Sequence, residues 1–339
     1  MQLTTGQKEQ FDEQGYLLVP NVMTTGDLLP VRTEYSALLA VRVADWVRRG
    51  VLSIDAIPEA DVPLEVGLAN LAANPTFDPE LFAELDITLP HAPFASIQPD
   101  SPFHVGPGLL ALTSTSALLD IVSDVVGPEI TASGNQHCRL KPPTAAPSTY
   151  NVGRSAANTA AQTPWHTDAM TQAVESDDTP ILTTWIPMAD VNLEDGCLLV
   201  VPGGHVSMPH VPWPIDPVSR ARIEAASAPV PAKLGDIVLL HKHMPHASSP
   251  NHGNRVRWSF DLRYYNSDLP GDRPWFPSIP VRSPSGRHTV VTSGEQWRAM
   301  WEAARLRLAA SGQPLPGRPD FARAVAETHL RRWAVGKYS

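Results

Sequence analysis

Apolar side chains recur with helical spacing in the first part of the chain. Gly15 predicts the end of a short polar helix whose last apolar position is Phe11, and the apolar run 16–19 is typical of a strand. Behind Thr25, a favoured capping residue, apolar positions three or four apart continue through residues 28–46 and predict a long second helix. The chain therefore begins with two helices on either side of one short strand.

Irregular and helical segments share the rest of the flanking sequence. Residues 51–106 contain many prolines and little periodicity, so we expect an irregular insertion with short helical turns. Helical spacing returns at 109–126, where a Gly-Pro pair predicts the end of a single helix. Two further helices are predicted near the C-terminus, at 294–310 and 318–335.

Strand-like runs separated by turns dominate residues 130–265. The predicted strands are 136–140, 182–186, 198–201, 237–240 and 256–265. Several short strands without intervening helices indicate a sandwich or a barrel. Residues 144–164 have almost no large apolar side chains, so we expect a mobile loop there. The expected fold class is mainly β with flanking helices.

The composition narrows the functional classes. The 339 residues are 42% hydrophobic and 18% charged, which is typical of a soluble globular protein, and no apolar run approaches the length of a membrane span. A formal net charge of −9 argues against binding to nucleic acid or to anionic lipid. Two cysteines are too few for a disulfide framework, and the N-terminal residues lack the pattern of a signal peptide. We therefore expect a cytoplasmic protein.

Three residues have the chemistry of a metal site. His166 and Asp168 are two positions apart, so their side chains share a face if the chain is extended, and His246 ends a later strand-like run. Two histidines and one carboxylate form the facial triad of non-haem Fe(II) oxygenases. Arg257 follows His246 by eleven residues, and Ser259 shares its strand face. The guanidinium of such an arginine can bind a carboxylate through two parallel hydrogen bonds.

Neighbouring histidines compete for the role of the distal ligand. His241, His243 and His252 lie close to His246 in the sequence, and the spacing to Arg257 favours His246. We interpret His241 as a strand residue with a partner in the core, and the other two as solvated turn residues.

Several other residues have two interpretations. Arg255 and Arg263 share the strand of Arg257. We interpret one or both as surface charges, although Arg263 could face a substrate. Trp185 could simply pack in the core, as large aromatic residues do. Gln136 is polar in a run where a core strand prefers apolar side chains, which favours a position in a pocket.

The joint pattern resembles the phytanoyl-CoA dioxygenase family of Fe(II)- and 2-oxoglutarate-dependent oxygenases over most of the chain. The similar segments are LTTGQKEQFDEQGYLLVPNVM, VGPEI, PWHTDAM, LTTWIPMADVNLEDGCLLVVPGGH and HKHMPHASSPNHGNRVRWSFDLRYYN. The resemblance implies that His166, Asp168 and His246 bind Fe(II). It further implies that Arg257 binds the far carboxylate of 2-oxoglutarate. Supporting positions at the co-substrate are implied for Ser248, Ser259, Trp185 and Lys141, and the polarity of Gln136 adds it to this set.

The chain departs from the family pattern at two positions. Thr167 stands where the family commonly has Gln, and Gly204 stands where it has Ser. Neither change removes a metal ligand. Related halogenases replace the ligating carboxylate with a small residue, so the intact Asp168 implies hydroxylation or another oxidation.

The resemblance also implies an architecture and an activity. We expect a double-stranded β-helix, a jelly-roll or cupin-like barrel, in a single oxygenase domain over residues 1–339. Residues 1–129 would supply N-terminal helices and the insertion, 130–265 the barrel core, and 266–339 a C-terminal strand and helices. The enzyme would use Fe(II), 2-oxoglutarate and O2 to hydroxylate or otherwise oxidise a small molecule, with release of succinate and CO2.

The sequence leaves the substrate open. The absence of a basic cluster argues against a CoA thioester, whose phosphates require cations, and favours a natural-product-like metabolite. Residues 51–107 and 144–164 are expected to cover the mouth of the barrel as a lid. Two alternatives remain at this point: a cupin-like metalloenzyme that does not use 2-oxoglutarate, and a non-catalytic small-molecule-binding barrel. The oligomeric state is unknown from the sequence.

Overall fold

The computed structural model describes most of the chain. The described residues are 2–57, 62, 64–74, 77–89, 97–143, 163–211 and 215–313. The predicted helix at 318–335 lies outside them, and so does the predicted loop at 144–164 except for its last two residues.

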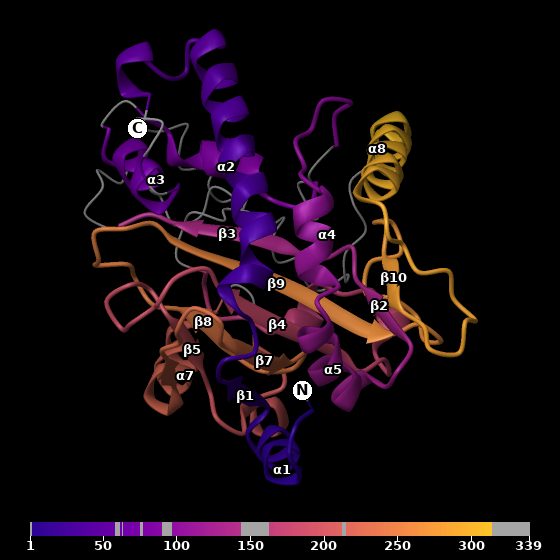
Figure 1. The fold of residues 1–339 in the computed structure, drawn as a ribbon. Coiled ribbons are helices and arrows are strands. Elements are labelled where there is room, and N and C mark those ends of the chain that lie inside the picture. The colour runs from indigo at the N-terminus through magenta and orange to yellow at the C-terminus, as the bar shows by residue number, and fades with distance from the viewer. Residues whose placement is uncertain are drawn as a thin grey trace.

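A large antiparallel sheet forms the centre of the molecule (Figure 1). Within the described residues its seven strands are β1 (Tyr16–Val19), β2 (Ile130–Ala132), β3 (His137–Lys141), β4 (Ile181–Pro187), β7 (Ile237–His241), β9 (Arg257–Asn266) and β10 (Ile279–Arg282). The long strand β9 pairs with β4 along one edge, and with β3 and then β2 along the other. Because side chains alternate along a strand, β9 presents one set of residues to each face of the sheet.

A second antiparallel sheet packs against one face of the first. In the part of the chain that the structure describes, it consists of β6 (Ala228–Val230), β5 (Leu198–Val200) and β8 (His246–Ser248), in that order. Trp185 and Leu240 of the large sheet share a buried hydrophobic cluster with Leu198 and Val200 of the small sheet. The fold is thus mostly antiparallel sheet with flanking helices, which confirms the predicted class at this level.

Helices lie on both sides of the two packed sheets (Figure 1). The α-helices are α1 (Thr5–Gln14), α2 (Thr25–Arg48), α3 (Leu64–Ala73), α4 (Pro107–Thr113), α5 (Ser116–Val126), α6 (Gly204–Ser207), α7 (Pro217–Ala226) and α8 (Gly294–Ser311). The 3-10 helices are η1 (Ile54–Ala56), η2 (Pro79–Leu85), η3 (Asp168–Thr171) and η4 (Val174–Ser176). Tyr35 of α2 packs against Trp258 and Phe260 of β9, with ring centroids 5.6 and 5.2 Å apart. Figure 1 shows α2 and α4 on one side of β9, and the three-stranded sheet with α7 on the other.

The start of α2 follows from a capping box. The hydroxyl of Thr24 accepts a hydrogen bond from the Asp27 N–H, and the Asp27 carboxylate accepts one from the Thr24 N–H. The N-cap is therefore Thr24, and the predicted cap Thr25 is wrong by one position. The positions that α2 buries repeat every three or four residues: Leu28, Val31, Tyr35, Leu39, Val43 and Trp46.

The predicted single helix at 109–126 is instead two helices. The axes of α4 and α5 differ by 47° across the break between them. The hydroxyls of Thr113, Ser114 and Thr115 each donate to the carbonyl four residues earlier, and such bonds bend and weaken helices. Among the described residues, no single helix is long and apolar enough to cross a membrane, and only the bent pair α4 and α5 meets both conditions jointly.

Besides the single turn of α6, two helices of 10 residues each appear where the sequence predicted none. α3 lies inside the stretch expected to hold only short turns, and it buries Leu68 and Leu71 completely. α7 separates β5 from β6, so the expectation of strands without intervening helices is wrong there. Its first turn is capped by the carboxylate of Asp216 and begins with a proline, a combination that the strand-based interpretation overlooked.

Candidate metal centre

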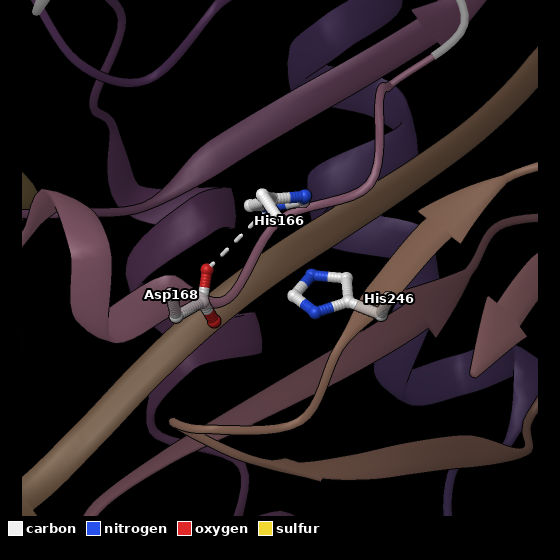
Figure 2. Close-up of side chains that lie close together, drawn as sticks. All are labelled: His166, Asp168 and His246. Carbon is white, nitrogen blue, oxygen red and sulfur yellow. Dashed lines mark ion pairs between the residues drawn. The ribbon is translucent and has the colours of Figure 1, made fainter. Parts of the chain in front are cut away.

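The two histidines and the aspartate of the predicted metal site lie together between the two sheets. One ligand atom from each of His166, Asp168 and His246 lies within 4.8 Å of the others. No other group of three or more His, Cys, Asp or Glu side chains in the described residues meets this condition. Nε2 of His166 is 3.9 Å from Oδ1 of Asp168, and the centroids of the two imidazole rings are 4.1 Å apart. Figure 2 shows the three side chains around a common space.

Backbone pairing joins the two distant segments. The N–H of His166 donates to the carbonyl of His246 over 3.0 Å, and the reverse bond is 2.9 Å long. Thr167 is extended, with φ −115° and ψ 144°, so His166 and Asp168 project to the same side. The chain then turns, because Asp168 begins the helix η3. The expected extended geometry therefore holds for one residue, and the segment is not a strand.

Both imidazole rings are oriented by carbonyl groups. Nδ1 of His166 donates to the carbonyl of Pro164, and Nδ1 of His246 donates to that of Met244, each over 2.9 Å. A carbonyl only accepts, so these bonds place the proton on Nδ1 and leave the Nε2 lone pair free to bind a metal. Burial, reinforced by His246, lowers the pKa of His166 to about 3, which keeps the ring neutral.

The carboxylate of Asp168 is held at both oxygens. Oδ1 accepts a hydrogen bond of 2.6 Å from the guanidinium of Arg263, and Oδ2 accepts one of 2.6 Å from the hydroxyl of Thr183. Burial alone would raise the pKa of Asp168, but Arg263 and then His246 hold it well below its usual range. Arg263 is 3% exposed, so its interpretation as a surface charge is wrong. Arg263 lies on the same face of β9 as Arg257, and this spacing was the sequence feature that could have indicated its burial.

This donor set fits a ferrous ion. Two neutral imidazole nitrogens and one ionised carboxylate oxygen are the ligands that non-haem iron sites use, and they leave other coordination positions open. All three side chains are fixed by hydrogen bonds to the protein, which is the second layer of contacts that metal ligands require.

Arg257 is buried without an ion pair in the described residues. It is 6% exposed, its Nη1 donates to the Ser259 hydroxyl over 2.5 Å, and its buried Nε has no hydrogen-bond partner. The guanidinium carbon lies 5.9 Å from the centroid of the Trp185 ring. Burial lowers the pKa of Arg257 to about 10. A buried cation of this kind is costly unless a carboxylate pairs with it, so the geometry favours an anionic ligand here.

Lys141 and Ser248 lie beside this arginine. Lys141 stands opposite Arg257 in the pairing of β3 with β9, and its Nζ donates to the Ser248 hydroxyl and to the carbonyl of Ser249. Burial, and then the charge of Arg257, lower the pKa of Lys141 well below its usual value. The ammonium is thus tied to the strand that contains His246.

One pocket connects two histidines of the metal cluster to Arg257. Five predicted site residues line it: His166, His246, Arg257, Ser248 and Trp185. Asp168, Ser259, Lys141 and Gln136 are not part of its wall. Gln136 is fully buried, and within the described residues neither its amide oxygen nor its amide nitrogen has a hydrogen-bond partner. The wall also contains Arg139 and Thr183, which the sequence analysis did not single out.

The competing histidines lie away from the cluster. His241 and His243 form a separate group with His205, with ring centroids 5.2 Å (His205 to His241) and 5.6 Å (His241 to His243) apart. The backbone N–H of His252 donates to the carbonyl of Glu194 in a different loop. Of the four histidines considered, the structure therefore brings only His246 to His166 and Asp168.

The fold and the site together define a class of protein. Two packed antiparallel sheets with two histidines and one carboxylate between them are typical of non-haem Fe(II) oxygenases. The family model for phytanoyl-CoA dioxygenase (PhyH) matches residues 11–259. The chain therefore belongs to the phytanoyl-CoA dioxygenase family, as its motifs predicted, and its metal and co-substrate are Fe(II) and 2-oxoglutarate.

Individual relatives are more distant. Phytanoyl-CoA dioxygenase domain-containing protein 1 of Mus musculus is 34% identical over 102 residues, which cover 24% of this chain and 32% of that protein. The match thus spans about a third of the curated relative. The apo structure of the non-haem monooxygenase ThoJ aligns over 96% of this chain and 99% of its own, with 15% identity and a TM-score of 0.52. Its nickel complex aligns over 90% and 98%, with 16% identity and a TM-score of 0.50. Both structures support the fold.

Proposed function

We propose that this protein hydroxylates or otherwise oxidises a small, natural-product-like metabolite, with release of succinate and CO2. In this proposal residues 1–339 form one oxygenase domain, and the two sheets are the halves of a double-stranded β-helix. The observation that carries the proposal is the buried guanidinium of Arg257, which has no ion pair in the part of the chain described and shares one pocket with the metal cluster. The proposal includes a cytoplasmic location and no nucleic-acid or membrane partner.

Each site residue has a role that follows from its contacts. His166, Asp168 and His246 would bind the ferrous ion on one face. When bound, iron and 2-oxoglutarate supply the activation of O2 that oxidises the substrate. Arg257 would bind the far carboxylate of 2-oxoglutarate through its planar donors, with Ser259 fixing the orientation of the guanidinium.

The remaining residues shape the co-substrate end of the pocket. Ser248 and Lys141 hydrogen-bond to each other beside Arg257, so they would orient the polar end of 2-oxoglutarate. Trp185 forms an apolar wall next to the guanidinium and would exclude water from it. Gln136 would act as a further polar contact, since both ends of its amide are buried without partners among the described residues.

An anaerobic titration tests this function. Fe(II) and 2-oxoglutarate added to the protein without O2 should produce the weak visible metal-to-ligand absorption of the chelate. Arg257→Ala should weaken 2-oxoglutarate binding by two orders of magnitude or more, because the carboxylate loses a charge-assisted bidentate partner. Arg255→Ala is the matched control, since Arg255 is exposed on the same segment and should leave the titration unchanged.

The titration also separates the alternative functions. A cupin-like metalloenzyme that does not use 2-oxoglutarate would bind iron, give no chelate band and tolerate Arg257→Ala. A binding barrel without catalysis would give no succinate from 2-oxoglutarate under air. Absence of the band from iron-loaded wild-type protein would overturn the proposed function.

A further inference from the structure

A second arginine lies beside Arg257 at the co-substrate end of the pocket. Arg139 is on β3 and stands opposite Ser259 in the pairing of β3 with β9 (Figure 1). Residues that stand opposite each other in an antiparallel pair project to one face of the sheet, with Cβ atoms about 5 Å apart. Arg139 and Arg257 both line the pocket that contains His166 and His246. The two arginines therefore reach this pocket from adjacent strands.

The guanidinium of Arg257 extends along β9 toward the position of Arg139. Its Nη1 donates to the hydroxyl of Ser259 over 2.5 Å, and its carbon lies 5.9 Å from the centroid of the Trp185 ring. Trp185 stands opposite Asp261 in the pairing of β4 with β9, four residues beyond Arg257. The charged end of Arg257 thus lies over the part of β9 that Arg139 faces from β3.

Arg139 is held at one of its three guanidinium nitrogens. Nε donates to Oδ2 of Asp261 over 2.9 Å, and the two terminal nitrogens make no hydrogen bond within the described residues. Because a guanidinium is planar, the bond at Nε fixes the plane in which the terminal N–H groups point. Two of those N–H groups can donate in parallel to the oxygens of one carboxylate.

The charges of the pocket wall do not balance within the described residues. Two of the lining side chains are cations, Arg139 and Arg257, and one is a carboxylate, Asp261. Burial lowers the pKa of Arg257 to about 10, Asp261 opposes this decrease, and the charge of Arg139 adds to it. A positive charge that stays buried without a partner is costly. One further carboxylate between the two guanidinium groups would balance the wall.

We propose that Arg139 binds the far carboxylate of 2-oxoglutarate together with Arg257, and so makes the site selective for a keto acid with two carboxylates. This inference rests on the proposed function, in which Arg257 binds that carboxylate. Asp261 would act as a positioning residue for the guanidinium of Arg139. A keto acid without the far carboxylate would leave both guanidinium groups unpaired, and such a site rejects the shorter-handed analogue strongly.

A comparison of two keto acids tests the assignment. 2-Oxopentanoate has the keto acid group and the five-carbon chain of 2-oxoglutarate, but a methyl group replaces the far carboxylate. Each compound is titrated without O2 into Fe(II)-loaded protein, and its affinity is read from the visible absorption of the chelate. Wild-type protein should bind 2-oxoglutarate at least about a hundredfold more tightly than 2-oxopentanoate.

Arg139→Gln is the most selective variant. The amide nitrogen of glutamine can take the place of the arginine Nε, so the bond to Asp261 is kept while the charge and the terminal donors are removed. We expect 2-oxoglutarate to bind about tenfold more weakly or worse, and 2-oxopentanoate to bind no more weakly than in wild type. Arg139→Lys keeps the charge and should recover part of the loss.

Arg273→Gln is the matched control. Arg273 is 4% exposed, lies between β9 and β10, and is not part of the wall of this pocket. Its replacement removes a buried guanidinium in the same way and should change the affinity for neither keto acid. The Tm and the Fe(II) affinity of Arg139→Gln should match those of the wild type, because its bond to Asp261 is retained.

Three results would overturn the inference. Arg139→Gln binds 2-oxoglutarate as tightly as wild type, or it loses affinity for both keto acids by the same factor, or Arg273→Gln shows the same selective loss. The second result would assign Arg139 to the structure of the pocket wall. If Arg139→Gln does not fold, Arg139→Lys carries the same comparison, with a smaller loss expected for 2-oxoglutarate alone.

Absence of the chelate band from wild-type protein with 2-oxoglutarate would instead count against the proposed function. A band that forms in wild type and is unchanged in Arg139→Gln counts against the role of Arg139 alone, so the two failures are distinguishable.

Discussion

The two faces of β9 bury different kinds of side chain. The residues that face the helices are apolar and at most 1% exposed, and they are Trp258, Phe260, Leu262 and Tyr264. The residues that face the small sheet are polar or charged, and they are Arg257, Ser259, Asp261 and Arg263. One strand of ten residues therefore supports the fold with one face and builds the candidate site with the other.

The difference follows from the cost of burying each kind of side chain. A buried aromatic or leucine side chain contributes about 1.5–3 kcal/mol to the free energy of unfolding. A buried charge costs free energy unless it is paired, and Arg257 has no carboxylate partner in the described residues. Burial of the apolar face thus offsets the free-energy cost of burying the charged one. We expect bound ligands to pair with the buried charge that lacks a partner.

The largest expected effect is at the charged face. Asp168→Ala should abolish metal-dependent activity, and it should also destabilise the protein by about 3–5 kcal/mol because Arg263 is left as an unpaired buried charge. Metal content after loading with Fe(II), together with urea unfolding, measures both effects. Asp178→Ala, at an exposed aspartate of a nearby loop, is the control and should change neither. Full metal content in Asp168→Ala would show that Asp168 is not a ligand.

The apolar face should respond through stability alone. Phe260→Ala removes a fully buried ring that packs against Tyr35 and Trp258, so we expect a loss of about 3–5 kcal/mol in the free energy of unfolding. Under conditions where this variant is folded, its affinities for Fe(II) and 2-oxoglutarate should match those of the wild type. A specific loss of 2-oxoglutarate affinity in folded Phe260→Ala would contradict the division between the faces.

This division explains what the sequence could predict. Runs of strand-type residues bounded by turns indicated β9 and the other long strands to within one or two residues, because such runs are a local property of the chain. The family motifs likewise indicated which residues would form the metal cluster. The break between α4 and α5 and the helices α3 and α7 depend on hydroxyl bonds, caps and packing, which the apolar spacing does not reveal.

The pairing of buried charges could not be predicted. The sequence did not show that Arg263 is buried and paired, because a residue's partner is set by which distant segment packs against it. Arg263 acquires its role from Asp168, which is brought to it by the bridge between His166 and His246. The only local sign that Arg263 is buried was its position on the same face of β9 as Arg257.

The smallest expected effects come from two adjacent threonines of β4, which test the division between the charged and the apolar face of β9. Thr183 donates to Oδ2 of Asp168, whereas Thr184 donates to the carbonyl of Leu262, and both are at most 2% exposed. Thr183→Val should weaken metal binding about tenfold, because partners of metal ligands typically contribute 10–100-fold. Thr184→Val should leave metal affinity unchanged and cost about 1 kcal/mol of unfolding free energy.

Titration of both variants with Co(II) distinguishes positioning of the ligand from general stability. Its visible spectrum reports the geometry of the bound metal as well as the affinity, and a purely structural role for Thr183 would not alter that spectrum. Thr183→Ser restores the hydroxyl and should recover most of the lost affinity. If Thr183→Val and Thr184→Val bind Co(II) equally well, the hydroxyl of Thr183 does not orient Asp168. The charged face would then depend on Arg263 alone to hold its carboxylate.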